Sequence, residues 1–199
     1  MRIFQRSLAL IGGIALSAAI SAPLKAQKNS NGGTVVLNAR ATESLSVIVT
    51  GGPIVDFTLR PNTAANAGST TTTIQTSWVL QFGRTALSLW AWVPNGAAAL
   101  TDGAGDNIPA SAVTATAAGS GSAGGALNTS TSGGAGVPAF VTPAAATGVQ
   151  IGQVRFFLFF NLTGNTTTTL TWNINTTGVP QLPAGNYTGI VNIQAQATP

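Results

Sequence analysis

The chain has 199 residues, carries eight lysines and arginines against four acidic residues, and contains neither histidine nor cysteine. The absence of both residue types excludes histidine acid–base chemistry, cysteine nucleophiles, the usual zinc ligands and disulfide bonds. Only 6% of the residues are charged, and the basic ones are scattered, so the basic stripe that nucleic-acid binding requires is missing. We therefore expect neither an enzyme nor a nucleic-acid-binding protein.

Residues 1–26 have the order of a secretory signal peptide. Arg2 and Arg6 precede a largely apolar stretch at residues 8–22, and Ala26 offers a small residue for cleavage before Gln27. This stretch is shorter than the roughly 20 residues that a membrane span prefers. We expect cleavage after Ala26, export to the periplasm, the cell surface or the medium, and no integral membrane segment in the remaining chain.

Residues 27–199 have the composition of a single all-β domain. Threonine, valine, isoleucine and aromatic residues fall in short runs, which glycine, proline and asparagine separate. The runs predict strands at 34–41, 44–49, 54–60, 71–80, 84–93, 154–162, 167–175 and 186–197. Short strands at this spacing are typical of an antiparallel immunoglobulin-like β-sandwich, which is the fold we expect.

The first of these strands alternates with particular regularity. Val35, Leu37, Ala39 and Ala41 share one face of residues 34–41. An antiparallel sheet needs one buried face and leaves the other in water, and this pattern fits such a strand.

A segment rich in glycine, alanine, serine and threonine lies between residues 94 and 150, with Asp102 and Asp106 as its only charged residues. It offers little apolar surface to offset the entropy of ordering it. We expect a long, flexible insertion with two short strands, near 112–116 and 139–142. Asp102 and Asp106 resemble part of a calcium loop, but EF-hand spacing and a bidentate glutamate are missing, so turn formation is favoured and no cofactor is expected.

The strands at 84–93 and 154–162 are apolar on both faces, although a two-layer sandwich would leave one face of each strand exposed to water. Several large aromatics together match or exceed the largest apolar patch of a typical monomer, about 300–600 Å². We consider three ways in which these faces are covered. The chain covers them itself, by the 94–150 segment or by a barrel-like closure. Otherwise the cover is a protein, either another copy of the chain or another surface protein, or it is a polysaccharide stacked on two of the tryptophans. The candidate interaction surface comprises Trp90, Trp92, Phe156, Phe157, Phe159 and Phe160.

Three features resemble bacterial exported immunoglobulin-like surface proteins, including fimbrial and spore-coat-U-type subunits. They are the signal peptide, the alternation in residues 35–41, and residues 182–197, where a Pro-Ala-Gly turn leads into a strand containing Tyr187. The disulfide that is familiar in pilins is absent. The resemblance implies a subunit that polymerises by strand donation, a form of β-augmentation.

We therefore expect a non-enzymatic secreted or cell-surface structural protein that associates with itself. One alternative is a carbohydrate- or matrix-binding module that uses Trp90 and Trp92. Another is a small outer-membrane β-barrel, which the glycine- and alanine-rich centre disfavours because it does not predict regular spanning strands.

Overall fold

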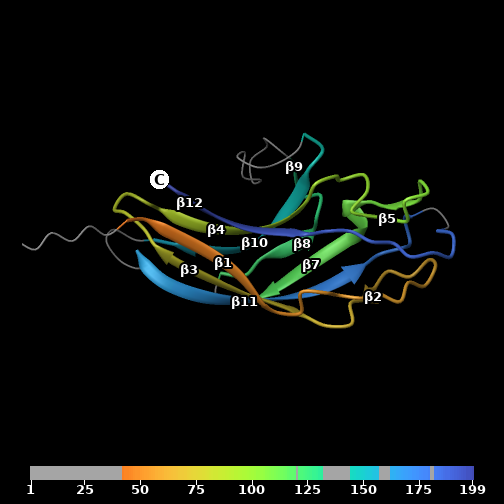
Figure 1. Cartoon of the computed structure of the whole chain (residues 1–199), viewed down its shortest axis with the longest axis horizontal. Coiled ribbons are helices and arrows are strands. Elements are labelled where there is room, and N and C mark those ends of the chain that lie inside the picture. Colours follow the sequence, from red (N-terminus) through yellow and green to blue (C-terminus); the bar gives the residue numbers. More distant parts are fainter. Residues whose placement is uncertain (1–41, 120, 132–143, 157–161, 180–181) are drawn as a thin grey trace, which may run out of the picture. The chain divides into compact units, whose positions relative to one another are not determined.

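The computed structural model describes residues 42–119, 121–131, 144–156, 162–179 and 182–199. All of them belong to one compact unit, Ala41–Pro199. This unit is almost entirely β, with antiparallel strands in two main sheets that do not close on themselves (Figure 1). The predicted all-β, antiparallel sandwich is confirmed. No helix in the described residues is long and apolar enough to cross a membrane.

The larger sheet has the spatial order β1-β3-β11-β7-β8, and β2 pairs with the end of β11. Its strands are β1 (Ser44–Gly51), β2 (Asn66–Ala67), β3 (Thr72–Val79), β7 (Val113–Ala118), β8 (Gly124–Ala126) and β11 (Thr163–Ile174). Along β3, Thr72, Ile74, Thr76 and Trp78 are buried and their neighbours are more exposed. This period of two is that of a strand with one face on the core.

The second sheet has the order β12-β4-β10-β9. Its strands are β4 (Ala86–Val93), β9 (Ser130–Thr131), β10 (Thr147–Arg155) and β12 (Asn192–Thr198). A short pair, β5 (Leu100–Thr101) with β6 (Asn107–Ile108), and one 3-10 turn, η1 (Ala110–Ala112), lie in the connection that follows β4. All of these strand pairs are antiparallel.

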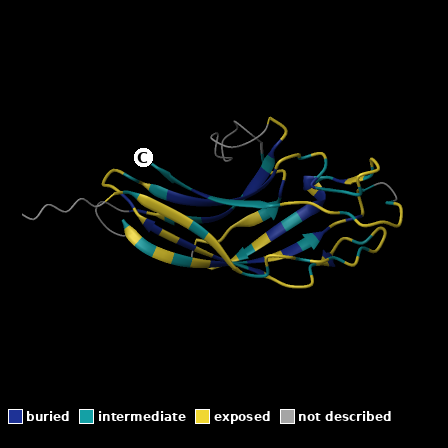
Figure 2. Ribbon diagram, viewed as in Figure 1, coloured by how far each residue is buried: buried dark blue, intermediate teal, exposed yellow. Residues whose placement is uncertain are grey.

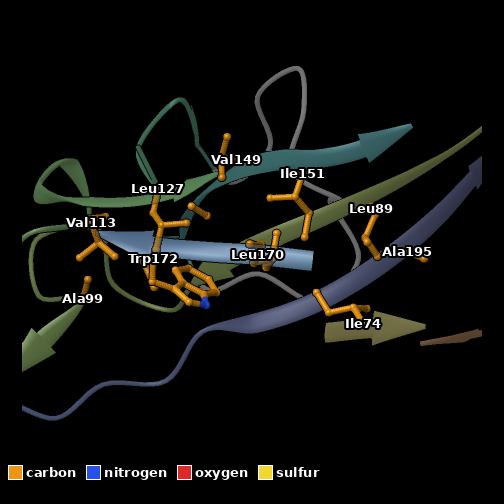
Figure 3. Packing of buried hydrophobic residues seen from close by; sticks show 14 of the residues in the cluster. Ile74, Leu89, Ala99, Val113, Leu127, Val149, Ile151, Leu170, Trp172 and Ala195 are labelled. Carbon is orange, nitrogen blue, oxygen red and sulfur yellow. The ribbon is translucent and has the colours of Figure 1, made fainter. Parts of the chain in front are cut away.

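The core lies between the two main sheets. Ile74 and Leu170 of the larger sheet, Ile151 of the second sheet and Leu127, in the turn after β8, are all fully buried. Figure 3 shows these side chains together with Trp172 in the space between the strands. Figure 2 shows the contrast with β1, which is mostly exposed along its length.

The predicted strands at 44–49, 71–80 and 84–93 are confirmed as β1, β3 and β4. The prediction for 54–60 is wrong, because this segment forms only an isolated bridge between Phe57 and Gly68. The last strand begins at Asn192 rather than 186, and β11 begins four residues earlier than predicted. Residues 34–41 and most of 154–162 lie outside the described residues.

The segment 94–150 contributes strands to the sandwich. β7 lies between β11 and β8 in the larger sheet, which confirms the strand predicted near 112–116. Its small residues allow close packing: Ala115 is fully buried, and a Cβ at Gly124 would lie 2.4 Å from the carbonyl oxygen of Ala115. The strand predicted near 139–142 lies outside the described residues.

The two ends of the sandwich differ, and we name them for reference. At the corner end, β1 begins, residues 80–85 connect β3 to β4, and β12 finishes. At the loop end lie the long connections 52–71, 94–112 and 175–191. In Figure 1 the corner end is on the left and the loop end is on the right.

Candidate functional site

Two strands leave open edges on the same flank of the sandwich. Within the described residues β1 pairs only with β3, and β12 pairs only with β4. These two edge strands approach one another across the sheets. Each therefore has backbone N–H and C=O groups that pair with no described strand, and such groups are a template for a further strand.

The inward face of β1 is apolar and exposed. Leu45 and Val49 pair with Trp78 and Ile74 of β3, whose side chains are 6% and 0% exposed. Leu45 and Val49 themselves are 37% and 41% exposed. The inward face of the larger sheet is therefore buried along β3 and exposed along β1, the neighbouring edge strand.

The facing wall is the inward face of β12. Ile193, Ala195 and Ala197 pair with Ala91, Leu89 and Leu87, which belong to the core. A cavity of about 210 Å³ lies at the loop-end half of this flank, where Val49, Val191 and Ile193 line it, and it reaches Leu127 and Trp172. We call this flank the edge groove and define it by Leu45, Val47, Val49, Val191, Ile193, Ala195 and Ala197.

A second groove, the loop groove, lies at the loop end and has a volume of about 1140 Å³. Its walls are residues 53–62 on one side and residues 174–179 and 182–189 on the other, with apolar side chains from both. Pro53, Val55 and Phe57 line this groove and the cavity of the edge groove. The two grooves therefore share a wall.

Buried hydrogen bonds fix one wall of the loop groove. Asn66, which is 4% exposed, accepts a hydrogen bond from the backbone N–H of Arg60 (2.8 Å) and donates one to the carbonyl of Ile174 (2.9 Å). Thr176 accepts from the N–H of Thr63 (2.9 Å) and donates to the carbonyl of Arg60 (2.7 Å). These bonds attach the 60–66 segment to the end of β11.

An ion pair fixes the start of β1 at the corner end. Nε and Nη2 of Arg84 donate to the two carboxylate oxygens of Glu43, at 2.8 and 2.9 Å, and the N–H of Gln81 donates to the same carboxylate. The hydrogen bond from Arg84, followed by the one from Gln81, lowers the pKa of Glu43 from 4.5 to about 2. The start of β1 is thus held at a defined place at the corner end.

The described aromatic candidates do not form an exposed surface. Trp90 and Trp92 lie on the outer face of β4, are 7% and 6% exposed, and have no hydrogen-bond partner for either indole N–H. Phe156 is buried in the core, with its ring centroid 6.2 Å from that of Trp78. Phe157, Phe159 and Phe160 lie outside the described residues.

The apolar surface that is open lies instead in the edge groove. The sequence predicted the strand at 44–49 but did not mark Leu45, Val47 and Val49 as a site. The only signal in the sequence was the absence of charged residues and proline from this strand, since natural edge strands commonly carry them.

Asp102 is engaged in its own turn. Its Oδ1 accepts hydrogen bonds from the backbone N–H groups of Ala104, Gly105 and Asp106, at 2.8, 3.2 and 3.1 Å. Gly103 adopts a φ of 79°, which a tight turn of this kind requires. The described residues contain no group of three or more acidic side chains that is able to hold a metal ion. Turn formation accounts for this sequence.

No family model, curated protein or solved structure matches the chain.

Proposed function

We propose that the protein is a non-enzymatic structural subunit of a secreted or cell-surface assembly, and that it joins copies of itself by strand addition in the edge groove. The main support for this proposal is the inward face of β1. Leu45 and Val49 on this face are more than a third exposed, although the β3 residues that pair with them are fully or nearly buried. A strand placed between β1 and β12 would pair with the free backbone groups of β12 and cover these side chains.

The added strand is residues 34–41 of a second copy. The alternation of this segment places Val35, Leu37, Ala39 and Ala41 on one face. Its eight residues span about 26 Å when extended, at about 3.3 Å per residue. This matches the eight residues of β1 and the seven of β12. Only Thr42 and Glu43 separate the segment from β1.

Paired variants on the two partners test this proposal. Leu37→Asp places a charge on the face of the added strand that enters the groove, and Val36→Asp places it on the opposite face. On the acceptor, Val49→Asp alters the groove, and Ile48→Asp alters the exposed outer face next to it. Burial of an unpaired carboxylate is costly, so Leu37→Asp and Val49→Asp abolish assembly and their controls retain it.

The measurement is the molar mass of the purified exported protein by light scattering after size-exclusion chromatography, with electron microscopy of the same samples. Wild-type protein gives oligomers or fibres, and Leu37→Asp and Val49→Asp each give monomers. A mixture of these two variants gives one-to-one pairs, because one retains an intact groove and the other an intact strand. Wild-type protein that stays monomeric at all concentrations would overturn the proposal.

A further inference from the structure

We infer that the copies stack head to tail, with the corner end of one copy docked on the loop groove of the next. This inference rests on the proposed strand addition. It assigns a second interface and a direction to the same assembly, and its partner is a second copy of this chain.

The direction follows from which way the added strand runs. β12 runs from the loop end to the corner end. A strand antiparallel to β12 would place Ala41 at the loop end of the acceptor, and the two-residue link would bring the corner end of the donor to that place. A parallel strand would bring corner end to corner end. The first arrangement continues as an open chain, whereas the second closes as a reciprocal dimer.

Backbone pairing favours the antiparallel direction. Every strand pair that the structure describes is antiparallel. Antiparallel ladders are also slightly more stable per residue than parallel ones. An antiparallel addition to β12 therefore extends the sheet in the pattern that it already has.

The apolar surfaces at the two ends favour the same direction. Phe82, on the connection between β3 and β4, is 69% exposed at the corner end. At the loop end, Ile54 is 74% exposed on the wall of the loop groove, which Val179 and Leu182 also line. Head-to-tail stacking covers Phe82 and the loop groove together, whereas a corner-to-corner contact leaves the loop groove uncovered.

The charges of the two ends are complementary. Among the described residues, the corner end carries Arg84, Arg155 and Glu43, a net side-chain charge of +1. The loop end carries Arg60 against Asp56, Asp102 and Asp106, a net side-chain charge of −2. The acidic loop end is attracted to Arg155 at the corner end in the head-to-tail arrangement, and the corner-to-corner arrangement gains no such attraction.

Energy transfer in a defined pair tests the direction. The chain has no cysteine, so single cysteines place dyes uniquely. The one-to-one pair of Val49→Asp, the strand donor, with Leu37→Asp, the acceptor, is labelled in two ways. In one sample the donor copy carries Phe82→Cys and the acceptor carries Ile54→Cys. In the other sample both copies carry Phe82→Cys.

Head-to-tail stacking predicts more efficient transfer between positions 82 and 54 than between 82 and 82. The reverse order, or equal efficiencies, would overturn the inference while leaving strand addition intact. If the pair does not form and the wild-type protein is monomeric, the proposed function itself fails, so the two failures are distinguishable.

A second variant checks the contact without labels. In an otherwise wild-type chain, Phe82→Ser is expected to raise the concentration below which the assemblies dissociate by about tenfold or more, because the burial of a phenylalanine is lost. Ile48→Ser, which removes a 55% exposed apolar side chain from the outer face of β1, outside both grooves and away from both ends, is the matched control and leaves that concentration unchanged. Equal effects of the two variants would contradict a specific contact at Phe82.

Discussion

Replacing Asn66 by alanine should destabilise the sandwich more than its position in a loop-rich region would indicate. The substitution removes the acceptor of the Arg60 N–H at 2.8 Å and the donor to the Ile174 carbonyl at 2.9 Å. A buried polar group left without a partner costs roughly 1–3 kcal/mol. Two such groups, one of them only partly buried, give an expected loss of about 2–4 kcal/mol. Native domains are stable by only about 5–15 kcal/mol, so this loss is readily measured.

Urea unfolding followed by tryptophan fluorescence measures the loss. For a urea dependence of about 1–3 kcal/mol per molar, the midpoint falls by about 1 M or more. Asn107→Ala, at an exposed site with one local hydrogen bond, is the control and stays within about 0.5 kcal/mol of wild type.

Thr176→Val provides the matched test of the same network. It keeps the side-chain shape and removes the hydroxyl that bonds Thr63 and Arg60. The Asn66 amide lies 3.5 Å from that hydroxyl, so the double variant should lose less stability than the two single losses together. A free energy of unfolding of Asn66→Ala within about 0.5 kcal/mol of wild type would refute the role given to these bonds in holding the loop groove.

Three further outcomes are expected. Leu170→Ala, at a fully buried site, should lower the free energy of unfolding by about 2–5 kcal/mol in urea titrations, and a loss below about 1 kcal/mol would contradict the core assignment. The pKa of Glu43 is about 2 in the folded chain against an ordinary value of 4.5, so its bond to Arg84 contributes stability above pH 4.5. That contribution disappears as the pH falls from about 4.5 to about 2, so thermal melts of Glu43→Gln and wild type should differ at neutral pH and converge at low pH. Burial, and then the charge of Asp106, raise the pKa of Tyr187, the only tyrosine; Asp106→Asn should lower it in an ultraviolet titration, and no change would argue against their proximity.

Alternation predicted β1, β3, β4, β11 and most of β12, because a strand with one buried face must repeat every two residues, but it missed β10. The same rule failed at residues 54–60. Val55, Phe57 and Leu59 alternate there and are half-buried, but they line the loop groove instead of pairing in a ladder. Period-two hydrophobicity reports a buried face and contains no information on whether a partner strand exists.

Composition did not predict how many strands the segment 94–150 contains. Its alanines and glycines contribute little apolar area each, but β7 is buried by close backbone packing, as Ala115 and Gly124 show. Trp90 and Trp92 show that an apolar face in the sequence does not reveal whether that face is covered. The sequence shows that both faces of β4 are apolar, but only the folded chain shows that the outer face is also buried.

The edge groove could not be predicted, since it depends on a topological fact. Each of its residues has the pattern of an ordinary sandwich strand, and the groove exists because no described strand lies between β1 and β12. Which two strands are the edges follows from the order of pairing, which alternation does not determine.

The low charge of the chain is what makes these edges suitable for assembly. Natural sheets usually protect a free edge with lysine, proline or inward-pointing charges, which prevent a second chain from pairing there. β1 and β12 contain none of these, and every charged side chain in the described residues lies at one of the two ends or in a connection. An unprotected apolar edge is a liability in a monomer and a requirement in a subunit that accepts a strand. The absence of charge from the open flank therefore fits the strand pairing that we propose, and the acidic loop end fits the proposed stacking direction.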